Sequence, residues 1–589
     1  MVYLTNQFQP IDVHFCYRNM HILDLSSLKG LNGKPIRRLF RLLKPERAFI
    51  KRLYWVSILS GLFGLVVPLC IQAIFTFIQA GQASASLWVL LSFLLVGLLI
   101  SGNLTLTQLN INETLQQRLF ARIGFDFTER IPRWRSDEHH APEMVNRFFE
   151  VLTIQKSLSK VLIDFFSALL QVFFGLLLLS FYHPLFIVFG LASIGTIIVA
   201  FRVMGPNGRK SSLGESSSKY AMVYWLEEIA RFIDVFKLSG APNLPVQKSN
   251  ALVEQYVDYR TEHYKILRNH YIMLIGFKII TVSGLIMLGT FLVFNEMISI
   301  GQFVASEIVM VLVIQSVEKI IFCIDPIYDT LTAVEKLGGI ADLPLAEHSG
   351  TTEVTPGSIS ISLDQVGVPP TTLSFTAEIQ GKEIVGIVGA NGSGKTTLIN
   401  LLGTRVPDTT GVLKYSGVRV EALQMDSLRS RIGEIIEDTD IFAGTVRENI
   451  SLGRPGVTDQ SIREACEGLG CWDDLQRLPK GLDTTLTPGA PGLPRSLAMK
   501  ISLARGVVTQ PSLLLIDATL VTLTRSERTK ILDYLTRADR PWTLIASIHH
   551  HDFMQRCDQI LHLEKGKVGG VFKLEEAEKQ SFYTELMVY

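Results

Sequence analysis

The fold of the second half of the chain is decided by the stretch Glu383-Ile-Val-Gly-Ile-Val-Gly389-Ala-Asn-Gly-Ser-Gly394-Lys395-Thr396. Its first six residues are apolar apart from Glu383, which is typical of a buried strand. The next eight satisfy the pattern GxxxxGK followed by Ser or Thr, in which glycines let backbone N–H groups curl round phosphate oxygens. A helical apolar pattern at 398, 401 and 402 follows. Strand, loop and helix therefore stand in the order that a phosphate-binding loop requires.

The chemistry of this loop predicts the cofactors. Lys395 is expected to reach the β and γ oxygens of a nucleoside triphosphate, and Thr396 offers a hydroxyl to Mg²⁺. We therefore expect ATP and Mg²⁺ to bind here. The residues expected to contact the phosphates are Gly389, Ala390, Asn391, Gly392, Ser393, Gly394, Lys395, Thr396 and Thr397.

Around the loop, short apolar runs alternate with amphipathic helices. This pattern predicts an α/β domain with a largely parallel sheet over residues 357–589. A stretch with Thr351, Pro356 and Gly357 precedes it. We place a linker at 331–356.

The first half of the chain has a different composition. The protein has 589 residues and is 48% hydrophobic, and its apolar residues crowd into the first 330 positions. Runs long enough to cross a bilayer lie near 53–78, 86–108, 160–181, 183–203, 270–295 and 299–324. They predict a polytopic α-helical membrane domain with six spans over 36–330. The formal net charge is only +1, which gives no indication of nucleic-acid binding.

The distribution of Lys and Arg predicts the orientation of this domain. The short connections at 79–85, 182 and 296–298 contain neither residue, whereas the long connections 109–159 and 204–269 are rich in both. Because positive loops stay inside, both long connections and both ends, including the N-terminal segment 1–35, are expected in the cytosol. Residues 36–50 alternate basic and apolar positions and are either an elbow helix along the inner membrane surface or a plain juxtamembrane anchor.

Ionisable residues inside the spans are candidates for function because they are costly there. Lys278 and Glu318 lie at similar depth, so we expect them to pair with one another, with a substrate contact as the alternative. Glu307 lies nearer the outer end and has no obvious partner at its depth. Glu307 and Lys278 are therefore the candidate residues of a substrate cavity.

Short outside turns combined with long helical inside loops resemble the membrane domain of exporters of the ATP-binding cassette (ABC) family. The cassette motifs agree. Asp517 after an apolar strand resembles the Walker B aspartate that holds Mg²⁺, and His549 stands where the family has its switch histidine. The segments 441–450 and 500–505 resemble those that follow the family's Q-loop and signature. The resemblance implies a half-transporter that acts as a homodimer or heterodimer, with transverse helices near 134–148 and 214–228.

The signature segment departs from the family. Its LSGGQ aligns with Leu493-Pro494-Arg495-Ser496-Leu497, and Pro494 lacks a backbone N–H. In the family this segment contacts the γ-phosphate bound to the opposite subunit. By this resemblance Arg495 and Ser496 are expected to make that contact, with the charge of Arg495 replacing backbone donors.

Two further departures concern catalysis. The family's catalytic glutamate is replaced by Ala518, which cannot accept a proton. The Q-loop glutamine aligns with Glu437, a candidate for catalysis and for Mg²⁺ coordination beside His549. The adenine-stacking aromatic is also missing from 366–370. These changes predict slow or atypical ATP hydrolysis.

The sequence thus favours an ATP-driven exporter, and the alternative is a regulatory or scaffold half that binds ATP and depends on a complete partner. The pattern looks closest to bacterial exporters of peptides or proteins of the hemolysin-secretion kind. That resemblance implies the bacterial inner membrane and a periplasmic adaptor as partner.

Overall fold

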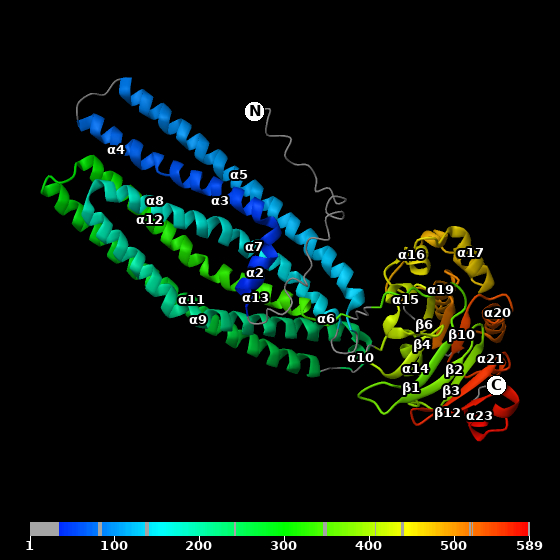
Figure 1. Cartoon of the computed structure of the whole chain (residues 1–589). Coiled ribbons are helices and arrows are strands. Elements are labelled where there is room, and N and C mark those ends of the chain that lie inside the picture. Colours follow the sequence, from blue (N-terminus) through cyan, green and yellow to red (C-terminus); the bar gives the residue numbers. More distant parts are fainter. Residues whose placement is uncertain are drawn as a thin grey trace. The chain divides into compact units, whose positions relative to one another are not determined.

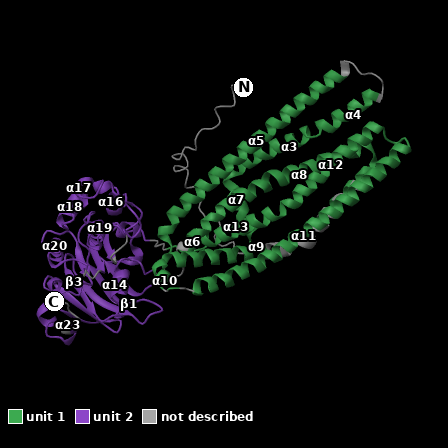
Figure 2. Ribbon diagram, turned by 180° about the vertical axis from the view of Figure 1, so that it is seen from behind, with its two compact units in different colours: residues 1–345 green, residues 346–589 purple. Residues whose placement is uncertain are grey.

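The computed structural model describes residues 34–79, 85–135, 141–238, 240, 243–345, 350–406, 408–436, 441–517, 520 and 522–586. The chain divides into two compact units, residues 1–345 and 346–589 (Figure 2). Unit 1 is helical and unit 2 contains a sheet with helices on its faces (Figure 1).

The six predicted apolar runs all lie on helices of unit 1. The helices are α2 (Pro35–Leu43), α3 (Arg47–Phe63), α4 (Val66–Gln79), α5 (Ala85–Arg130), α6 (Ala141–Asn146), α7 (Glu150–Ser159), α8 (Phe166–Tyr182), α9 (Pro184–Arg231), α10 (Ile233–Leu238), α11 (Asn243–Phe294), α12 (Ile300–Phe322) and α13 (Ile324–Ala341). A short 3-10 helix, η3 (Lys44–Glu46), joins α2 to α3, and a π-helix at Lys160–Phe165 joins α7 to α8. Residues 331–341, which the sequence assigns to the linker, belong to α13.

Within the described part of the chain, four helical stretches are long and apolar enough to cross a membrane: Pro35–Ile78, Leu87–Arg133, Glu143–Tyr182 and Asn243–Phe294. They contain four of the six predicted runs. The other two lie on α9 and α12, which are helical but fall outside these four stretches. Unit 1 is therefore a multi-pass membrane domain, and a total of six spans stays a prediction.

The long helices continue without a break beyond their apolar runs, as expected from their helical periodicity. The helix α5 has 46 residues and α9 has 48. Of the two predicted transverse helices, the one near 134–148 coincides with α6. The one at 214–228 is wrong, because these residues lie inside α9 and the turn with α10 comes only after Arg231.

The helix α13 packs against two chemically different surfaces. On one side it joins an apolar cluster with α2, α5 and α7 that includes Leu42, Leu119, Val151 and Leu337. On the other side it meets α9, whose contacts with α13, α7 and α11 we call the serine seam. It consists of Ser211 with His263 (3.0 Å), Ser212 with Thr332 (2.9 Å), Ser216 with Glu150 (3.2 Å) and Ser217 with Lys336 (2.9 Å). His263 also contacts Asp325 of α13 at 2.9 Å.

The sheet of unit 2 has ten strands among the described residues, in the order β5-β4-β1-β2-β12-β11-β3-β10-β9-β6. The strands are β1 (Ile361–Gly367), β2 (Ser374–Ile379), β3 (Ile384–Gly389), β4 (Thr410–Tyr415), β5 (Val418–Arg419), β6 (Ile432–Ile436), β9 (Leu513–Asp517), β10 (Thr543–Ala546), β11 (Gln559–Glu564) and β12 (Lys567–Phe572). The strands β6, β9, β10, β3 and β11 are parallel, as predicted. The pairs β1–β2, β1–β4 and β4–β5 are antiparallel. A separate two-stranded sheet pairs β7 (Gly444–Thr445) with β8 (Thr485–Leu486).

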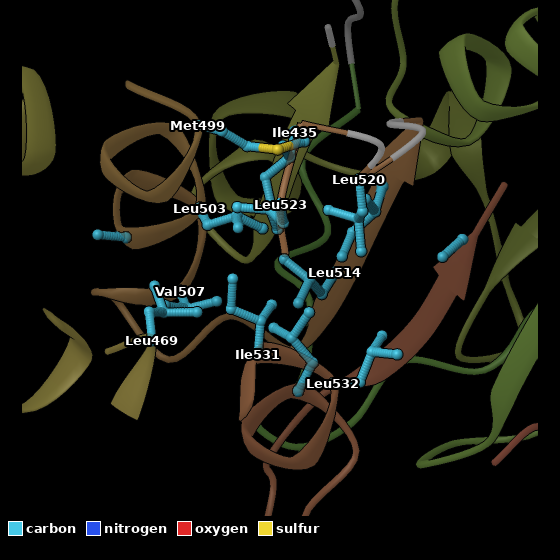
Figure 3. Close-up of a cluster of buried hydrophobic side chains, with 14 of the residues drawn as sticks. Ile435, Leu469, Met499, Leu503, Val507, Leu514, Leu520, Leu523, Ile531 and Leu532 are labelled. Atoms are coloured by element: carbon cyan, nitrogen blue, oxygen red, sulfur yellow. The ribbon is translucent and has the colours of Figure 1, made fainter. Parts of the chain in front are cut away.

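Helices cover both faces of the parallel strands. They are α14 (Lys395–Leu402), α15 (Met425–Arg429), α16 (Val446–Ser451), α17 (Asp459–Gly468), α18 (Trp472–Gln476), α19 (Arg495–Val507), α20 (Arg525–Leu535), α21 (His551–Met554), α22 (Leu574–Ala577) and α23 (Ser581–Leu586). Figure 3 shows Met499 of α19 beside Ile435 of β6, while Leu503 and Val507 of the same helix lie on the side of Leu514 of β9; Ile531 and Leu532 of α20 belong to the same cluster. This core fixes α19 against the strand that carries Asp517.

Candidate functional site

The phosphate loop lies between β3 and α14, as the sequence predicts. All six residues of β3 are buried, and the loop turns into α14 through Gly394 with φ +103°. Gly392 also has a positive φ, +80°. Both values lie in the region that side chains with a Cβ avoid, so the chain can make this turn because glycine occupies both positions.

Gly389 is required for a different reason. A Cβ on this residue would lie 2.5 Å from the carbonyl oxygen of Leu563 and 2.5 Å from Ser393 Oγ. The loop is therefore packed so closely against β11 that a larger residue would displace it. The Oγ of Ser393 is buried and has no hydrogen-bond partner among the described residues.

Lys395 is held inside the loop that it follows. Its Nζ donates to the carbonyl oxygens of Gly389 at 2.7 Å and Ala390 at 3.0 Å. Burial lowers the pKa of Lys395, and the nearby carboxylate of Asp517 acts in the opposite direction. The ammonium and the carboxylate thus lie within electrostatic reach of one another.

Three adjacent parallel strands bring the site residues together. Because β9, β10 and β3 are neighbours, their carboxyl ends lie at one edge of the sheet. Asp517 ends β9, the loop follows β3, and His549 follows β10. Desolvation lowers the pKa of His549, with Lys395 as the next cause, while Asp517 opposes the shift. The predicted Lys395, Asp517 and His549 therefore share one site.

The arrangement fits ATP and Mg²⁺. His549 Nε2 is buried and has no hydrogen-bond partner in the described part of the chain, so it is available to a phosphate oxygen. Thr396, exposed in the first turn of α14, and Asp517 supply a hydroxyl and a carboxylate, the hard oxygen ligands that Mg²⁺ prefers.

Two predicted positions lie outside the described residues. Glu437 follows Ile436 directly, and Ile436 is the register partner of Asp517. Ala518 follows Asp517. The roles assigned to Glu437 and to the substitution at 518 therefore stay predictions.

The altered signature forms the start of α19. Pro494 is the N-cap residue with φ −56° and ψ 136°, and no side chain caps the helix. Arg495 is the first helical residue and is exposed, while Ser496 is half-buried. This end of the helix presents a guanidinium to solvent.

Behind this end, a buried lysine ties α19 to α20. Lys500 Nζ donates to Glu527 Oε1 at 2.8 Å and to the carbonyl oxygen of Gly470 at 3.4 Å. The bond from Lys500 is the main cause that lowers the pKa of Glu527 to about 2. Sequence reasoning missed this pair, although Thr524 and Glu527 form a capping box with a recognisable spacing.

In unit 1, the predicted pairing of Lys278 with Glu318 is confirmed. Lys278 Nζ donates to Glu318 Oε2 at 2.6 Å. Glu307 Oε1 is buried and has no hydrogen-bond partner among the described residues. A substrate cavity at these residues stays a prediction.

Comparison with known proteins agrees with this geometry. Residues 373–521 match the ABC transporter family. The chain superposes on a bacterial Atm1-family ABC exporter with ATP bound, with a TM-score of 0.79 over 92% of this chain and 97% of that one, at 16% identity. Unit 2 is an ATP-binding cassette of the ABC transporter type, and the chain has the fold of an ABC exporter.

Particular relatives cover less of the chain. An uncharacterized ABC transporter ATP-binding protein of Bacillus subtilis, YfiC, is 32% identical over 36% of this chain and 35% of its own length. The ATP-dependent lipid A-core flippase of Burkholderia thailandensis is 26% identical over 46% and 47%. The probable multidrug resistance protein YheI of Bacillus subtilis is 27% identical over 48% and 49%. The chain thus spans at most about half the length of these curated relatives.

Proposed function

We propose that the chain is one half of an ATP-driven exporter that acts as a dimer. The observation that carries this proposal is the meeting of Lys395, Asp517 and His549 at the phosphate loop, in a chain that also has a multi-pass helical unit. Among the described residues, His549 Nε2 has no hydrogen-bond partner. Such a site suits binding of a nucleoside triphosphate, and the membrane domain is the part of the chain whose transport this binding would drive.

The residues have distinct tasks in this proposal. The loop N–H groups and Lys395 bind and orient the β and γ phosphates, and His549 contacts the γ-phosphate. Thr396 and Asp517 would hold Mg²⁺, with Glu437 as a further ligand, and the bound ion would supply positive charge beside the phosphates. Arg495 and Ser496 contact the nucleotide held by the other subunit.

The missing glutamate favours slow turnover. Ala518 has no proton acceptor, so the attacking water lacks its expected base, and Glu437 and His549 remain as candidates. In a homodimer both sites would carry this change. In a heterodimer with an ordinary cassette, each site would lack one element. For this reason the second candidate function is a regulatory half that binds ATP and hydrolyses little.

Substrate and location belong to the proposal too. By resemblance to bacterial peptide and protein exporters, we place the chain in the bacterial inner membrane with the cassette in the cytosol, a peptide or protein as substrate and a periplasmic adaptor as partner. The relatives named for lipid A-core and multidrug transport make lipids and drugs alternative substrates. Glu307 is the residue most suited to contact substrate in the membrane.

The test is the ATPase activity of the purified chain in lipid, alone and with any cassette protein that co-purifies. Turnover by the chain alone, abolished by Lys395→Ala, would exclude the regulatory half. Turnover only with a second cassette protein would exclude the homodimer. Absence of nucleotide binding in both preparations would refute the proposed function altogether.

A further inference from the structure

The start of the described chain carries a dense group of basic residues. Between residues 37 and 52 they are Arg37, Arg38, Arg41, Lys44, Arg47, Lys51 and Arg52. Glu46 is the single acidic residue in this stretch. These residues span α2, η3 and the first turns of α3, directly before the first apolar run.

Two of the charged residues point inward and fix α2. Arg38 is fully buried, and its guanidinium donates to Asp342 Oδ2 at 2.5 Å and to the carbonyl oxygen of Glu335 at 3.2 Å. Gly338 makes room for it, because a Cβ there would lie 1.8 Å from Arg38 Nη1. Glu335 lies in α13 and Asp342 directly follows it. Because Arg38 bonds to both, α2 lies against the last turns of α13 (Figure 1).

Glu46 is also used inward. It is 6% exposed and forms ion pairs with Arg122 at 3.1 Å and Arg118 at 3.5 Å, both from α5. The single carboxylate of the stretch, that of Glu46, therefore faces the interior of the protein. Its exposed charges are all positive.

The exposed side of α2, η3 and the first turn of α3 combines charge with exposed hydrocarbon. Arg37, Arg41, Lys44 and Arg47 are exposed. Ile36 and Phe40, one helical turn apart, are 57% and 70% exposed. We call these six residues the elbow face. A basic stripe beside large apolar side chains, at the entry to a membrane span, is the composition of a helix that lies in a lipid interface.

We propose that the elbow face is a binding site for the headgroups of anionic phospholipids, with Ile36 and Phe40 placed among the acyl chains. Arginine forks donate in pairs to phosphate oxygens, and basic residues close to an anionic leaflet are attracted to it electrostatically. Because Arg38 lies on the other side of the same two turns, lipids bound to the elbow face also hold α2 against α13. Anionic lipid therefore stabilises unit 1. This inference is independent of transport activity.

The experiment uses the full chain in phosphatidylcholine micelles and adds phosphatidylglycerol. The test variant carries Arg37→Gln, Arg41→Gln, Lys44→Gln and Arg47→Gln. The matched control carries Arg463→Gln, Arg477→Gln, Lys565→Gln and Lys567→Gln, which remove four exposed charges from the cassette. Melting temperature and the phosphatidylglycerol that co-purifies per chain are both measured.

We expect phosphatidylglycerol to raise the melting temperature of the parent and of the control, and the test variant to lose at least about half of both signals. A charge-preserving variant, Arg37→Lys, Arg41→Lys and Arg47→Lys, should retain most of them. If the quadruple variant does not fold in phosphatidylcholine, the double variant Arg37→Gln and Arg41→Gln replaces it.

Two results would overturn the proposal. One is an equal response of the test variant and the parent to phosphatidylglycerol. The other is the same stabilisation by inorganic phosphate or glycerol phosphate alone, which would make the face a site for free anions. Loss of the response in Ile36→Ser with Phe40→Ser, with charges intact, would further support insertion into the lipid.

Discussion

The cassette contains two helix starts that bear on phosphate, and they are built differently. At α14, glycines with positive φ and a lysine bonded to two carbonyls surround the place where backbone N–H groups converge. At α19, Pro494 has no N–H to offer, no side chain caps the helix, and Arg495 is exposed. Both ends carry the positive pole of a helix dipole. The start of α14 can bind phosphate through its backbone N–H groups and Lys395, whereas the start of α19 offers mainly the charge of Arg495.

The difference between the two helix starts separates nucleotide contacts that this chain's own fold provides from contacts that need a second subunit. The geometry of the phosphate site at α14 is set by strands β3, β9 and β10, which are buried in the sheet. Arg495 is exposed at the start of α19, so in our proposal its contact with phosphate depends on a partner subunit. We therefore expect substitutions at α14 to abolish binding and those at α19 to weaken it.

The largest effect is expected for Lys395→Ala. This change removes a charge-assisted donor to two phosphate oxygens, so ATP affinity should fall on the order of 1000-fold. Binding of a fluorescent ATP analogue to the purified chain measures it, with Lys567→Ala, an exposed lysine of β12, as control. Unchanged affinity in Lys395→Ala would remove the phosphate loop from the site.

Next in size is a gain of function at the missing base. Ala518→Glu restores a carboxylate after Asp517, and a positioned general base contributes 100-fold or more, so turnover should rise about 100-fold. Ala518→Gln, which has the same size without the base, is the control. An equal rise with Gln, or none with Glu, would show that slow turnover has another origin.

A smaller effect is expected at α19. Arg495→Ala removes one charge-assisted contact, which is about a tenfold loss of ATP affinity in the assembled dimer. Affinity of the dissociated chain should not change. Arg525→Ala, at the equivalent first position of α20, is the matched control. A loss of equal size in the dissociated chain would place Arg495 at its own nucleotide and erase the contrast between the two helix starts.

The smallest effect is a pH dependence. The pKa of His549 is lowered, so near pH 6 the unfolded chain binds more protons at this residue than the folded one, and stability falls as pH falls below about 6.5. Protection of the β9 and β10 amides against hydrogen exchange, after correction for the intrinsic exchange rate at each pH, should fall by less than about tenfold per unit of falling pH, the limit for one proton. His549→Gln should flatten this slope while His562→Gln, on β11, should change exchange near β10 less. An unaltered slope in His549→Gln would assign the dependence to other histidines.

Much of this site follows from sequence because it is local. The strand, loop and helix from 383 to 402 are contiguous, and the order of motifs indicates that Asp517 ends one strand and that His549 follows another. The pair of Lys278 and Glu318 could be predicted because helical depth can be counted from a turn. Lys500 and Glu527 lie on different helices, 27 residues apart, and no periodicity relates them.

The misplaced transverse helix has a physical reason. Residues 211–218 read Ser-Ser-Leu-Gly-Glu-Ser-Ser-Ser, a composition that favours a turn. In the structure Ser211, Ser212 and Ser216 are buried and bonded to side chains of α11, α13 and α7. Tertiary partners satisfy the hydroxyls that would otherwise compete with the helix, and α9 continues.

Because of the serine seam, the contact of α9 with α13 is chemically unlike the contact of α13 with α2, α5 and α7. When α9 and α11 move away from α13, each hydroxyl exchanges a protein partner for water, at a net change of only about 0.5–1.5 kcal/mol per bond. On the other side of α13, parting would expose hydrocarbon at about 25 cal/mol per Å². Water can therefore replace the contacts of the seam one by one at a small net change in free energy, whereas the apolar cluster of α2, α5, α7 and α13 has no such exchange.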